Sequence, residues 1–344
     1  MPKGPIALDA MGGDFAPLET VKGAVRAASD FGIEVVLVGE GQQIKTQLHQ
    51  LGEKEGGRLS ICHAPEVVSM SDAPSVVIRG KSRSSIRVAS NLVKRGEAAG
   101  VVSAGNTGAA MAAARCEFGL AEGVQRPAIA QVFPNRKHGT VVLDLGANVD
   151  CKIDYLVQFG VMGSVYASLV LNLASPKVGL LSIGSEDTKG NEFTRQVLAA
   201  MREAPTIDFV GNVEGRDVFK GDVDVIVCDG FVGNIVLKIT EGVAETVMGM
   251  MKDAFSSSVL SKAGAALVRP SLKRLKKQMD YAEYGGAILL GVNGVCVICH
   301  GGSNAKAIRN ALKRAHEFAE SGIVEQITEK MQNRSSSESG SVGL

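Results

Sequence analysis

The strongest constraint on the fold is a repeated order of apolar strand, glycine-containing loop and helix. In Val101–Ala110 an apolar run ends at Ser103, a small polar turn follows, and helix-forming residues continue to Ala114. Ile33–Val38 is apolar throughout, which is typical of a parallel strand covered on both faces. The alternation of strands and helices predicts a doubly wound α/β sheet with ligand loops at the carboxyl ends of its strands.

The composition fits such a fold and excludes several classes of protein. The chain has 344 residues and a formal net charge of +1, so it has no strong overall field to attract nucleic acid. No uninterrupted apolar run reaches the ~18 residues that span a bilayer. The chain enters a strand directly after its start, and we expect no signal peptide. The six cysteines lie mostly in apolar runs, so we expect reduced thiols in the cytoplasm.

The loop after the Val101 strand is a candidate anion site. Small residues leave the backbone open, and the start of a helix favours negative charge. The candidate phosphate-binding residues of this loop are Ser103, Gly105, Asn106, Thr107 and Gly108. An ordinary strand-to-helix connection, in which glycine serves only the turn, is the alternative.

Two earlier segments add candidate groups. The first strand exits through Asp9, Gly12 and Gly13, after which Asp14 is expected to cap a helix. The segment 79–85 contains three cations and three hydroxyl groups, and its Arg79 is a candidate phosphate ligand. A solvated basic loop is the alternative for that segment.

The middle of the chain predicts further loops of the same kind. Residues 129–133 and 140–145 form a hairpin, so the sheet is mixed, and the second strand exits through Asp144 and Asn148. Asn148 could instead cap the helix expected at 153–173. Lys189 follows the strand at 177–183 as a candidate cation. The strand at 223–228 leads into a loop at 229–234 and a helix at 235–251, and the loop contributes Asp229, Gly230, Gly233 and Asn234. If this strand neighbours the Val101 strand in parallel, two helix starts surround one pocket.

A second hairpin is predicted at 285–304, turning at Asn293-Gly294. It exits into a loop with His300 and Gly301, where His300 is a candidate general acid or oxyanion donor; a polar loop histidine is the alternative. Cys296 and Cys299 would point to opposite faces of a strand, and no second such pair exists, so we predict no metal site.

Residues 256–279 are basic and amphipathic, with six cations, no acid and Pro270 dividing two helical patterns. They could contact an anionic membrane or an acidic protein partner, or form a dimer arm with solvated charges. The candidate contact residues are Leu260, Leu267, Arg269, Lys273, Arg274, Lys276 and Lys277. We expect one catalytic domain at 1–332 with a protruding arm at about 252–281, and a disordered Ser-rich tail at 333–344.

Five segments together carry a family resemblance: IALDAMGGDFAP at 6–17, VVSAGNTGAA at 101–110, LDLGANVDCK at 143–152, DGFVGNIVLK at 229–238 and GGAILLGVNGVCVICHGGSN at 285–304. In this order they resemble the PlsX-type phosphate acyltransferases of bacterial phospholipid synthesis. The likeness spans roughly residues 5–330.

The resemblance implies a three-layer α/β/α sandwich with a mostly parallel mixed sheet, similar to isocitrate and isopropylmalate dehydrogenases. It implies transfer of an acyl group from acyl carrier protein to inorganic phosphate, giving acyl phosphate and free carrier, without a cofactor. It also implies a cytoplasmic homodimer at the inner face of the cell membrane, where a membrane glycerol-3-phosphate acyltransferase takes the acyl phosphate.

From that chemistry we infer roles for the candidate residues. Asn234 or His300 would serve the oxyanion or the leaving sulfur, Lys189 would supply a cation, and Asp229 and Asp9 would orient these donors.

Other functions remain as alternatives. A phosphotransacetylase-like enzyme would use coenzyme A in place of the carrier. A dehydrogenase is disfavoured because no GxGxxG follows the first strand. A membrane scaffold without activity would explain the basic segment and leave the glycine loops unexplained. Acyl-chain preference is not readable from the sequence.

Overall fold

The computed structural model describes residues 4–279 and 285–340, and within them it does not describe the side chains of residues 259, 273–279 and 335–340. The strands are β1 (Ile6–Asp9), β2 (Val35–Gly39), β3 (Leu59–His63), β4 (Gly100–Ser103), β5 (Ala128–Phe133), β6 (Thr140–Leu143), β7 (Lys177–Leu181), β8 (Asp208–Val213), β9 (Val225–Val227), β10 (Ala287–Leu290) and β11 (Val295–Ile298). The helices are α1 (Leu18–Phe31), α2 (Gly41–Gln50), α3 (Val76–Arg79), α4 (Ser85–Lys94), α5 (Thr107–Glu117), α6 (Ile153–Leu171), α7 (Glu192–Glu203), the 3-10 helix η1 (Gly215–Phe219), α8 (Gly230–Ser256), α9 (Val259–Met279), α11 (Ala305–Ser321) and α12 (Ile323–Gly340).

The described strands form one mixed sheet in the order β3-β2-β1-β4-β11-β10-β5-β6-β9-β7-β8. Strands β1 to β4 and β11 are parallel to one another, and so are β6, β7, β8 and β9. The antiparallel strands β10 and β5 join these two sets, which therefore run in opposite directions. Both predicted hairpins, β5–β6 and β10–β11, are confirmed.

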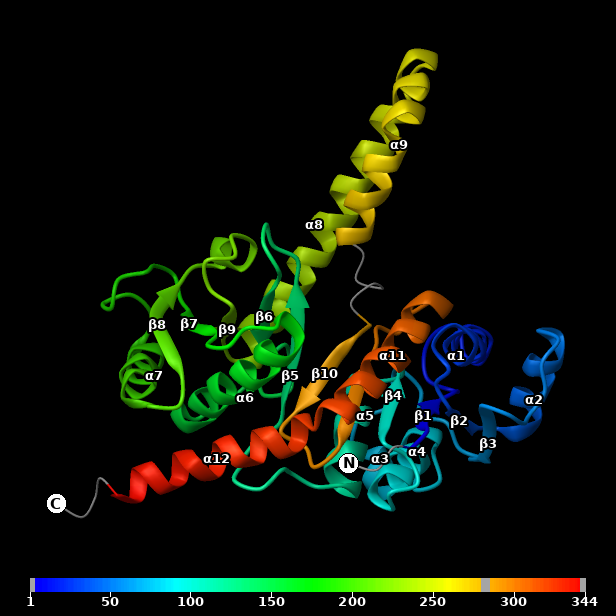
Figure 1. Ribbon diagram of the computed structural model, residues 1–344, viewed down its shortest axis with the longest axis horizontal. Coiled ribbons are helices and arrows are strands. Elements are labelled where there is room, and N and C mark those ends of the chain that lie inside the picture. Colours follow the sequence, from blue (N-terminus) through cyan, green and yellow to red (C-terminus); the bar gives the residue numbers. More distant parts are fainter. Residues whose placement is uncertain (1–3, 280–284, 341–344) are drawn as a thin grey trace.

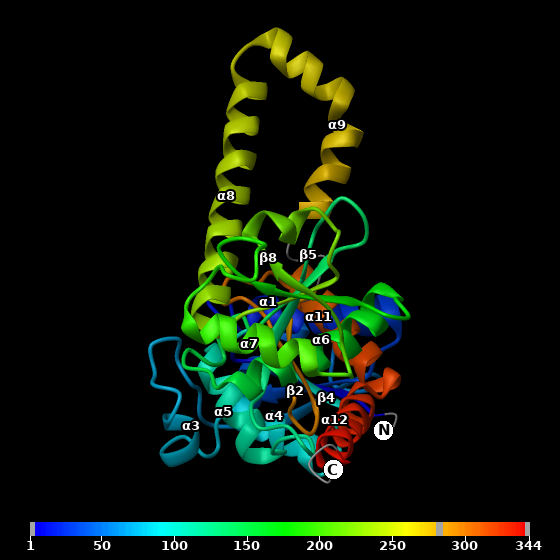
Figure 2. The ribbon, with the colours of Figure 1, turned by 90° about the vertical axis from the view of Figure 1, so that its left-hand side faces the viewer.

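Helices cover both faces of this sheet (Figures 1 and 2). Side chains alternate along each strand, so Leu8 packs into the core on one face and Ala7 into the core on the other. Helices α1, α2, α6, α7, α11 and α12 cover the first face, and α3, α4, α5, η1 and part of α8 cover the second. The predicted three-layer α/β/α fold is confirmed.

Helix α6 has the length and apolar composition of a membrane span, but 67% of its most apolar window is buried inside the protein. Its side chains fill the core of the first face, where Phe159 is fully buried. We therefore interpret α6 as a core helix.

The ends of several helices differ from the sequence predictions. Asp14 does not cap α1, which begins at Leu18 after Pro17, and no side chain caps α6. Helix α8 begins at Gly230 and not near residue 235, because Asp229 caps it and accepts a hydrogen bond from the Val232 N–H. The segment predicted as a loop is thus the first turn of a helix.

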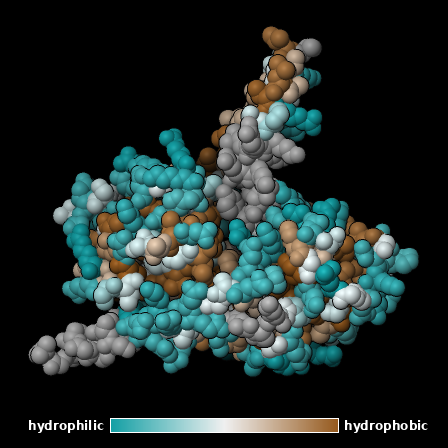
Figure 3. Space-filling view, in the orientation of Figure 1, coloured by the Kyte–Doolittle hydropathy of each residue, from teal (hydrophilic) through white to brown (hydrophobic). Residues whose placement is uncertain are grey.

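The arm is longer than predicted (Figures 1 and 2). The outer part of α8 and the whole of α9 project from the body, and α9 is a single helix that contains Pro270. Figure 3 shows hydrophobic side chains at the end of the arm farthest from the body. Leu260 and Leu267 are 83% and 85% exposed there, and Arg269 is exposed beside them. The side chains of Lys273, Arg274, Lys276 and Lys277 lie outside the described part of the chain.

The carboxyl-terminal segment also differs from the prediction. Helix α12 continues to Gly340, so the backbone of residues 333–340 is helical where we expected disorder. The side chain of Arg334 is buried and paired with Asp154 of α6, which ties α12 to the core. The last residues of the predicted tail, 341–344, lie outside the described part.

Candidate active site

Three predicted loops meet at the carboxyl ends of β1, β4 and β11, which are neighbours in the sheet. We call residues 9–14, 103–108 and 300–303 the first loop group. The Asp14 N–H donates to the Gly301 carbonyl at 2.9 Å, and the Cys299 N–H donates to the Ser103 carbonyl at 2.8 Å. The structure thus brings together Asp9, Gly12, Gly13, Ser103, Gly105, Asn106, Thr107, Gly108, His300 and Gly301.

A buried carboxylate organises this group. The Ser103 hydroxyl donates to Asp9 Oδ2 at 2.7 Å, and the Gly105 N–H donates to Ser103 Oγ at 3.1 Å. Burial raises the pKa of Asp9, while hydrogen bonds from the Ser85 and Ser103 hydroxyls and from backbone N–H groups oppose that rise. Asp9 therefore fixes the rotamer of Ser103, and Ser103 fixes the loop.

Glycine is required where the loops approach each other. A Cβ added at Gly12 would lie 2.5 Å from Asp9 Oδ2 and 2.8 Å from the Gly105 nitrogen. Gly13 has φ +109°, and a Cβ there would lie 3.0 Å from the Gly301 carbonyl oxygen. The floor of the group is therefore bare backbone, as an anion-binding loop needs.

The start of α5 faces this floor with unused donors. Within the described part of the chain, the backbone N–H groups of Asn106, Thr107 and Gly108 have no acceptor. The Asn106 side chain is already hydrogen-bonded: its oxygen caps α5 by accepting from the Ala109 N–H. Its Nδ2 donates at 3.0 Å to the carbonyls of Met70 and Asp72. The backbone at this helix start is therefore the better anion ligand than the Asn106 side chain.

The basic segment 79–85 is mostly structural. Lys81 pairs with Asp72 at 2.6 Å and also donates to the Val67 carbonyl at 2.8 Å. This pairing holds the pKa of Asp72 below its usual value. Arg79 is exposed and, among the described residues, makes no ion pair, so it remains a candidate phosphate ligand. The Lys81–Asp72 pair was missed in the sequence because it joins two short loop segments.

The other predicted loops lie at the carboxyl ends of β6, β9 and β7. We call residues 144–148, 229–234 and 182–191 the second loop group. Asp144 is fully buried and accepts hydrogen bonds from the N–H groups of Ile129, Gly146, Ala147 and Asn148 at 2.6 to 3.2 Å. Asn148 Nδ2 also donates to it at 2.9 Å. Burial raises the pKa of Asp144, against these hydrogen bonds.

The Asp144 loop holds the start of α8. The Gly230 N–H donates to the Asn148 carbonyl at 2.7 Å. A Cβ at Gly230 would lie 2.6 Å from that same oxygen, and one at Gly233 would overlap the Asp144 carbonyl oxygen. Gly230 and Gly233 are thus needed for close packing, and Asn234 follows on the same turn, near Gly146.

Lys189 joins the second loop group because β7 pairs with β9. Its N–H donates to the Glu186 carbonyl at 3.0 Å, and its ammonium makes no ion pair among the described residues. His300, in the first group, accepts the Gly302 N–H at its Nδ1 at 3.1 Å. In the neutral ring the proton is then on Nε2.

The predicted arrangement of the two groups is wrong in one respect. Strands β4 and β9 are neither neighbours nor parallel, because β11, β10, β5 and β6 lie between them. However, α5 and α8 pack on the same face of the sheet. A substrate that touches both groups would lie across that face.

No group of three or more His, Cys, Asp or Glu side chains in the described part of the chain is placed to hold a metal ion. Cys296 and Cys299 are buried, and burial raises the pKa of each thiol to about 12. They act as core residues.

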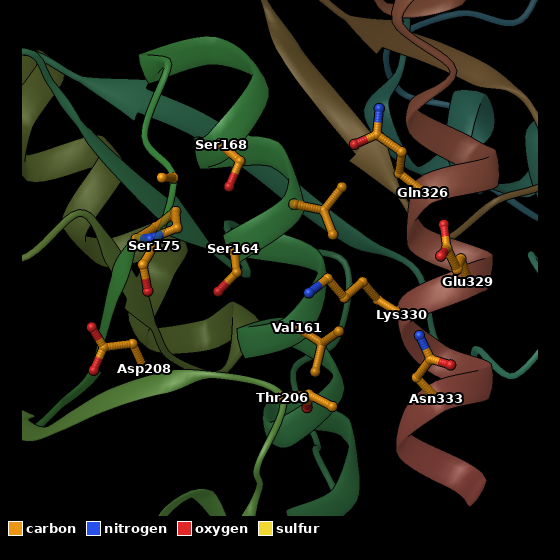
Figure 4. Close-up of a pocket in the computed structure, with 13 residues that line it drawn as sticks. Val161, Ser164, Ser168, Ser175, Thr206, Asp208, Gln326, Glu329, Lys330 and Asn333 are labelled. Carbon is orange, nitrogen blue, oxygen red and sulfur yellow. The ribbon is translucent and has the colours of Figure 1, made fainter.

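A groove of about 270 Å³ lies elsewhere, between α6, α12 and the segments that precede β7 and β8 (Figure 4). In Figure 4 Lys330 points across it toward Ser164. None of the predicted site residues lines this groove.

The fold belongs to an α/β class that is shared by phosphotransacetylases and some dehydrogenases. A phosphotransacetylase from Streptococcus pyogenes has the same fold, with a TM-score of 0.64 at 18% identity over 93% of this chain and 95% of that chain. The 4-hydroxythreonine-4-phosphate dehydrogenase from Klebsiella pneumoniae matches with a TM-score of 0.52 at 15% identity, over 92% and 100% of the two chains.

The sequence places the chain within this class. The family model described as fatty acid synthesis protein matches residues 5–326, and the chain belongs to that family. The phosphate acyltransferase of Geobacter sulfurreducens is 54% identical over 95% of this chain and 94% of its own length. That of Pelotomaculum thermopropionicum is 52% identical over 95% of each. The chain is an acyltransferase of this family, which confirms the predicted resemblance.

Proposed function

We propose that the protein transfers an acyl group from the thioester of an acyl carrier protein to inorganic phosphate. The observation that carries this proposal is the start of α5, where three backbone N–H groups without an acceptor stand over a glycine floor. In a member of an acyltransferase family, backbone donors suited to a small anion fit phosphate as the acyl acceptor.

The chemistry needs no covalent enzyme intermediate and no cofactor. A phosphate oxygen attacks the thioester carbon, a tetrahedral oxyanion forms, and the carbon–sulfur bond breaks to give acyl phosphate and a thiolate that takes a proton. The Ser103 hydroxyl is committed to Asp9, so it positions the loop and does not attack. The protein contributes orientation and charge stabilisation.

We propose the remaining roles from the chemistry of the residues in the two loop groups. His300 belongs to the first loop group, and we assign it the role of proton donor to the leaving sulfur. Lys189 and Asn234, in the second loop group, would stabilise negative charge on the thioester oxygen. Asp229 and Asp144 act through α8 and the Asn148 loop, as positioning residues.

The alternative acyl donor is coenzyme A, as the shared fold with a phosphotransacetylase suggests. The test is phosphate-dependent thiol release from acyl carrier protein and from acyl-coenzyme A by the same preparation. We expect a higher kcat/KM with the carrier. A preference for acyl-coenzyme A would move the assignment to a phosphotransacetylase-like enzyme.

The exposed face of α8 supports a homodimer. Large apolar side chains recur along one face of this helix, mostly four residues apart: Phe231, Val232, Ile235, Ile239, Val243, Val247 and Met250. Such a face on a projecting helix is covered by a partner in stable proteins. The same face on a second copy would pair with it around a two-fold axis.

The end of the arm supports contact with a membrane. Leu260 and Leu267 are exposed together with Arg269, and apolar groups beside cations favour an anionic lipid surface. We expect a cytoplasmic protein held at the inner face of the cell membrane, where acyl phosphate passes to a membrane glycerol-3-phosphate acyltransferase. Vesicle co-sedimentation of Leu260→Asp tests this contact against docking of the carrier protein on the same arm.

A further inference from the structure

We propose that Met70 and Phe15 form the seat of the acyl chain, beside the start of α5. This inference rests on the proposed function, since it names the place where the apolar part of that substrate lies. Met70 lies in the segment 66–84, which contacts the first loop group. Phe15 directly follows residues 9–14 of that group.

A series of contacts joins this seat to the phosphate loops. Asn106, the cap of α5, donates to the Met70 carbonyl at 3.0 Å. A Cβ at Gly301 would lie 2.8 Å from Met70 Cε, so the thioether methyl rests on that glycine. The Asp14 N–H donates to the Gly301 carbonyl at 2.9 Å, and Phe15 is the next residue in the chain.

Both side chains are exposed. Phe15 is 55% exposed and Met70 is 47% exposed. The Lys81–Asp72 pair and the Asn106 amide fix the turn that carries Met70. Large apolar groups held open to solvent at a site indicate an apolar ligand, and methionine adapts to flexible chains. A carboxylate oxygen of Asp14 lies 3.3 Å from the position of a Cβ added at Gly301. This carboxylate would form the solvent-facing edge of the seat.

The reaction itself places an acyl chain here. The thioester carbon must touch the phosphate oxygen, so the chain starts within a few atoms of the start of α5. The second loop group also exposes apolar residues, including Ile183 at 83%. However, the Gly230 and Val232 N–H groups at the start of α8 already have acceptors, which makes that helix start the weaker phosphate site.

The test is kcat/KM for palmitoyl and butyryl thioesters of the carrier, measured for the full-length protein and its variants. Met70→Ala and Phe15→Ala should each lower the value for palmitoyl about tenfold and change that for butyryl less than about twofold. Met70→Leu, which keeps a large apolar side chain, should retain the preference for palmitoyl that Met70→Ala loses. Ile183→Ala, in the second loop group, tests the other exposed apolar position and should leave the chain preference unchanged. Val210→Ala, an exposed apolar residue of β8 outside both loop groups, is the matched control and should change neither value. Binding of a fluorescent fatty acid should weaken in the same two variants.

Two results would overturn the proposal. One is equal loss with both thioesters in Met70→Ala; the other is a change in chain preference caused by Ile183→Ala. Failure of the proposed function looks different, because the unmodified protein would then release no thiol in response to phosphate with either thioester.

Discussion

Ser103 Oγ lies 2.7 Å from Asp9 Oδ2, so a buried carboxylate on β1 holds the residue at which the α5 loop begins on β4. The same hydroxyl oxygen accepts the Gly105 N–H, which sets the backbone that leads into α5. A carboxylate near a phosphate site would repel the ligand if it faced it directly. Asp9 is buried behind glycines, and it acts by fixing the loop.

The Asp9 carboxyl predicts a specific pH dependence of stability. Its pKa in the folded protein is raised above the ordinary value of 3.8 by burial, so the ionised form is the costly one. The stability it contributes is complete below pH 3.8 and is lost as the pH rises through the raised pKa. Asp9→Asn should therefore gain free energy of unfolding relative to the unmodified protein as the pH increases from about 4 toward 8.

Denaturant unfolding of the unmodified protein and of Asp9→Asn across that pH range measures the difference in their free energies of unfolding. The contributions of Asp144 and the other carboxyls are the same in both proteins and cancel. This interpretation would be contradicted if that difference stayed constant with pH, or if Asp9→Asn became less stable relative to the unmodified protein as the pH rises.

Phosphate binding should depend on the bare floor at Gly12. In Gly12→Ala the new methyl group would meet Asp9 and the Gly105 nitrogen, and would displace the loop below the start of α5. We expect the KM for phosphate to rise at least about tenfold, since a small shift of this loop misaligns its donors. Gly215→Ala adds a methyl group in open space and is the control. Unchanged phosphate kinetics in Gly12→Ala would place the phosphate elsewhere.

Stability should depend on Gly233 for a different reason. Its alanine variant would push a methyl group into the Asp144 carbonyl oxygen, beneath the first turn of α8. We expect a loss of about 3 kcal/mol or more in the free energy of unfolding. Gly242→Ala, on the same helix, adds a methyl group with no neighbour and should be neutral or stabilising by up to about 1 kcal/mol. Similar melting curves for the two variants would refute the packing argument.

The sequence predicted the elements and the loops well, because apolar runs and glycine turns are local signals. It placed the start of α8 five residues late, since Gly230 and Gly233 suggested a loop and were in fact needed for contact with the Asp144 loop. It also treated the Asn106 side chain as a free ligand. Its amide donates to the carbonyls of Met70 and Asp72, which are 36 and 34 residues away in the sequence, and only the folded chain shows that this group is already engaged.

The order of the sheet was the other point that local patterns did not reveal. The β10–β11 hairpin inserts between β4 and β5 and so separates the strands that carry the two loop groups, while the β5–β6 hairpin reverses the strand direction between them. Nothing in the strands near residues 101 and 225 encodes that insertion, because it depends on a hairpin much later in the chain.

The apolar face of α8 predicts that a single charge dissociates the dimer. Ile239→Lys would bury an ammonium group within the proposed interface, at a cost that exceeds the contribution of one apolar contact. Sedimentation velocity should show a dimer for the unmodified protein and a monomer for Ile239→Lys at micromolar concentration. Glu245→Lys, an exposed position on another face of the helix, is the control and should remain dimeric. A monomeric unmodified protein would contradict the dimer.

The most direct measurement for the central claim is thiol release from long-chain acyl carrier protein by the purified protein, with and without inorganic phosphate. We predict that thiol is released only with phosphate, and that hydroxylamine traps the acyl phosphate product in amounts equal to the released thiol. Release at the same rate without phosphate, or thiol without trapped acyl product, would show that water or a protein side chain takes the acyl group and that the start of α5 does not hold the acceptor.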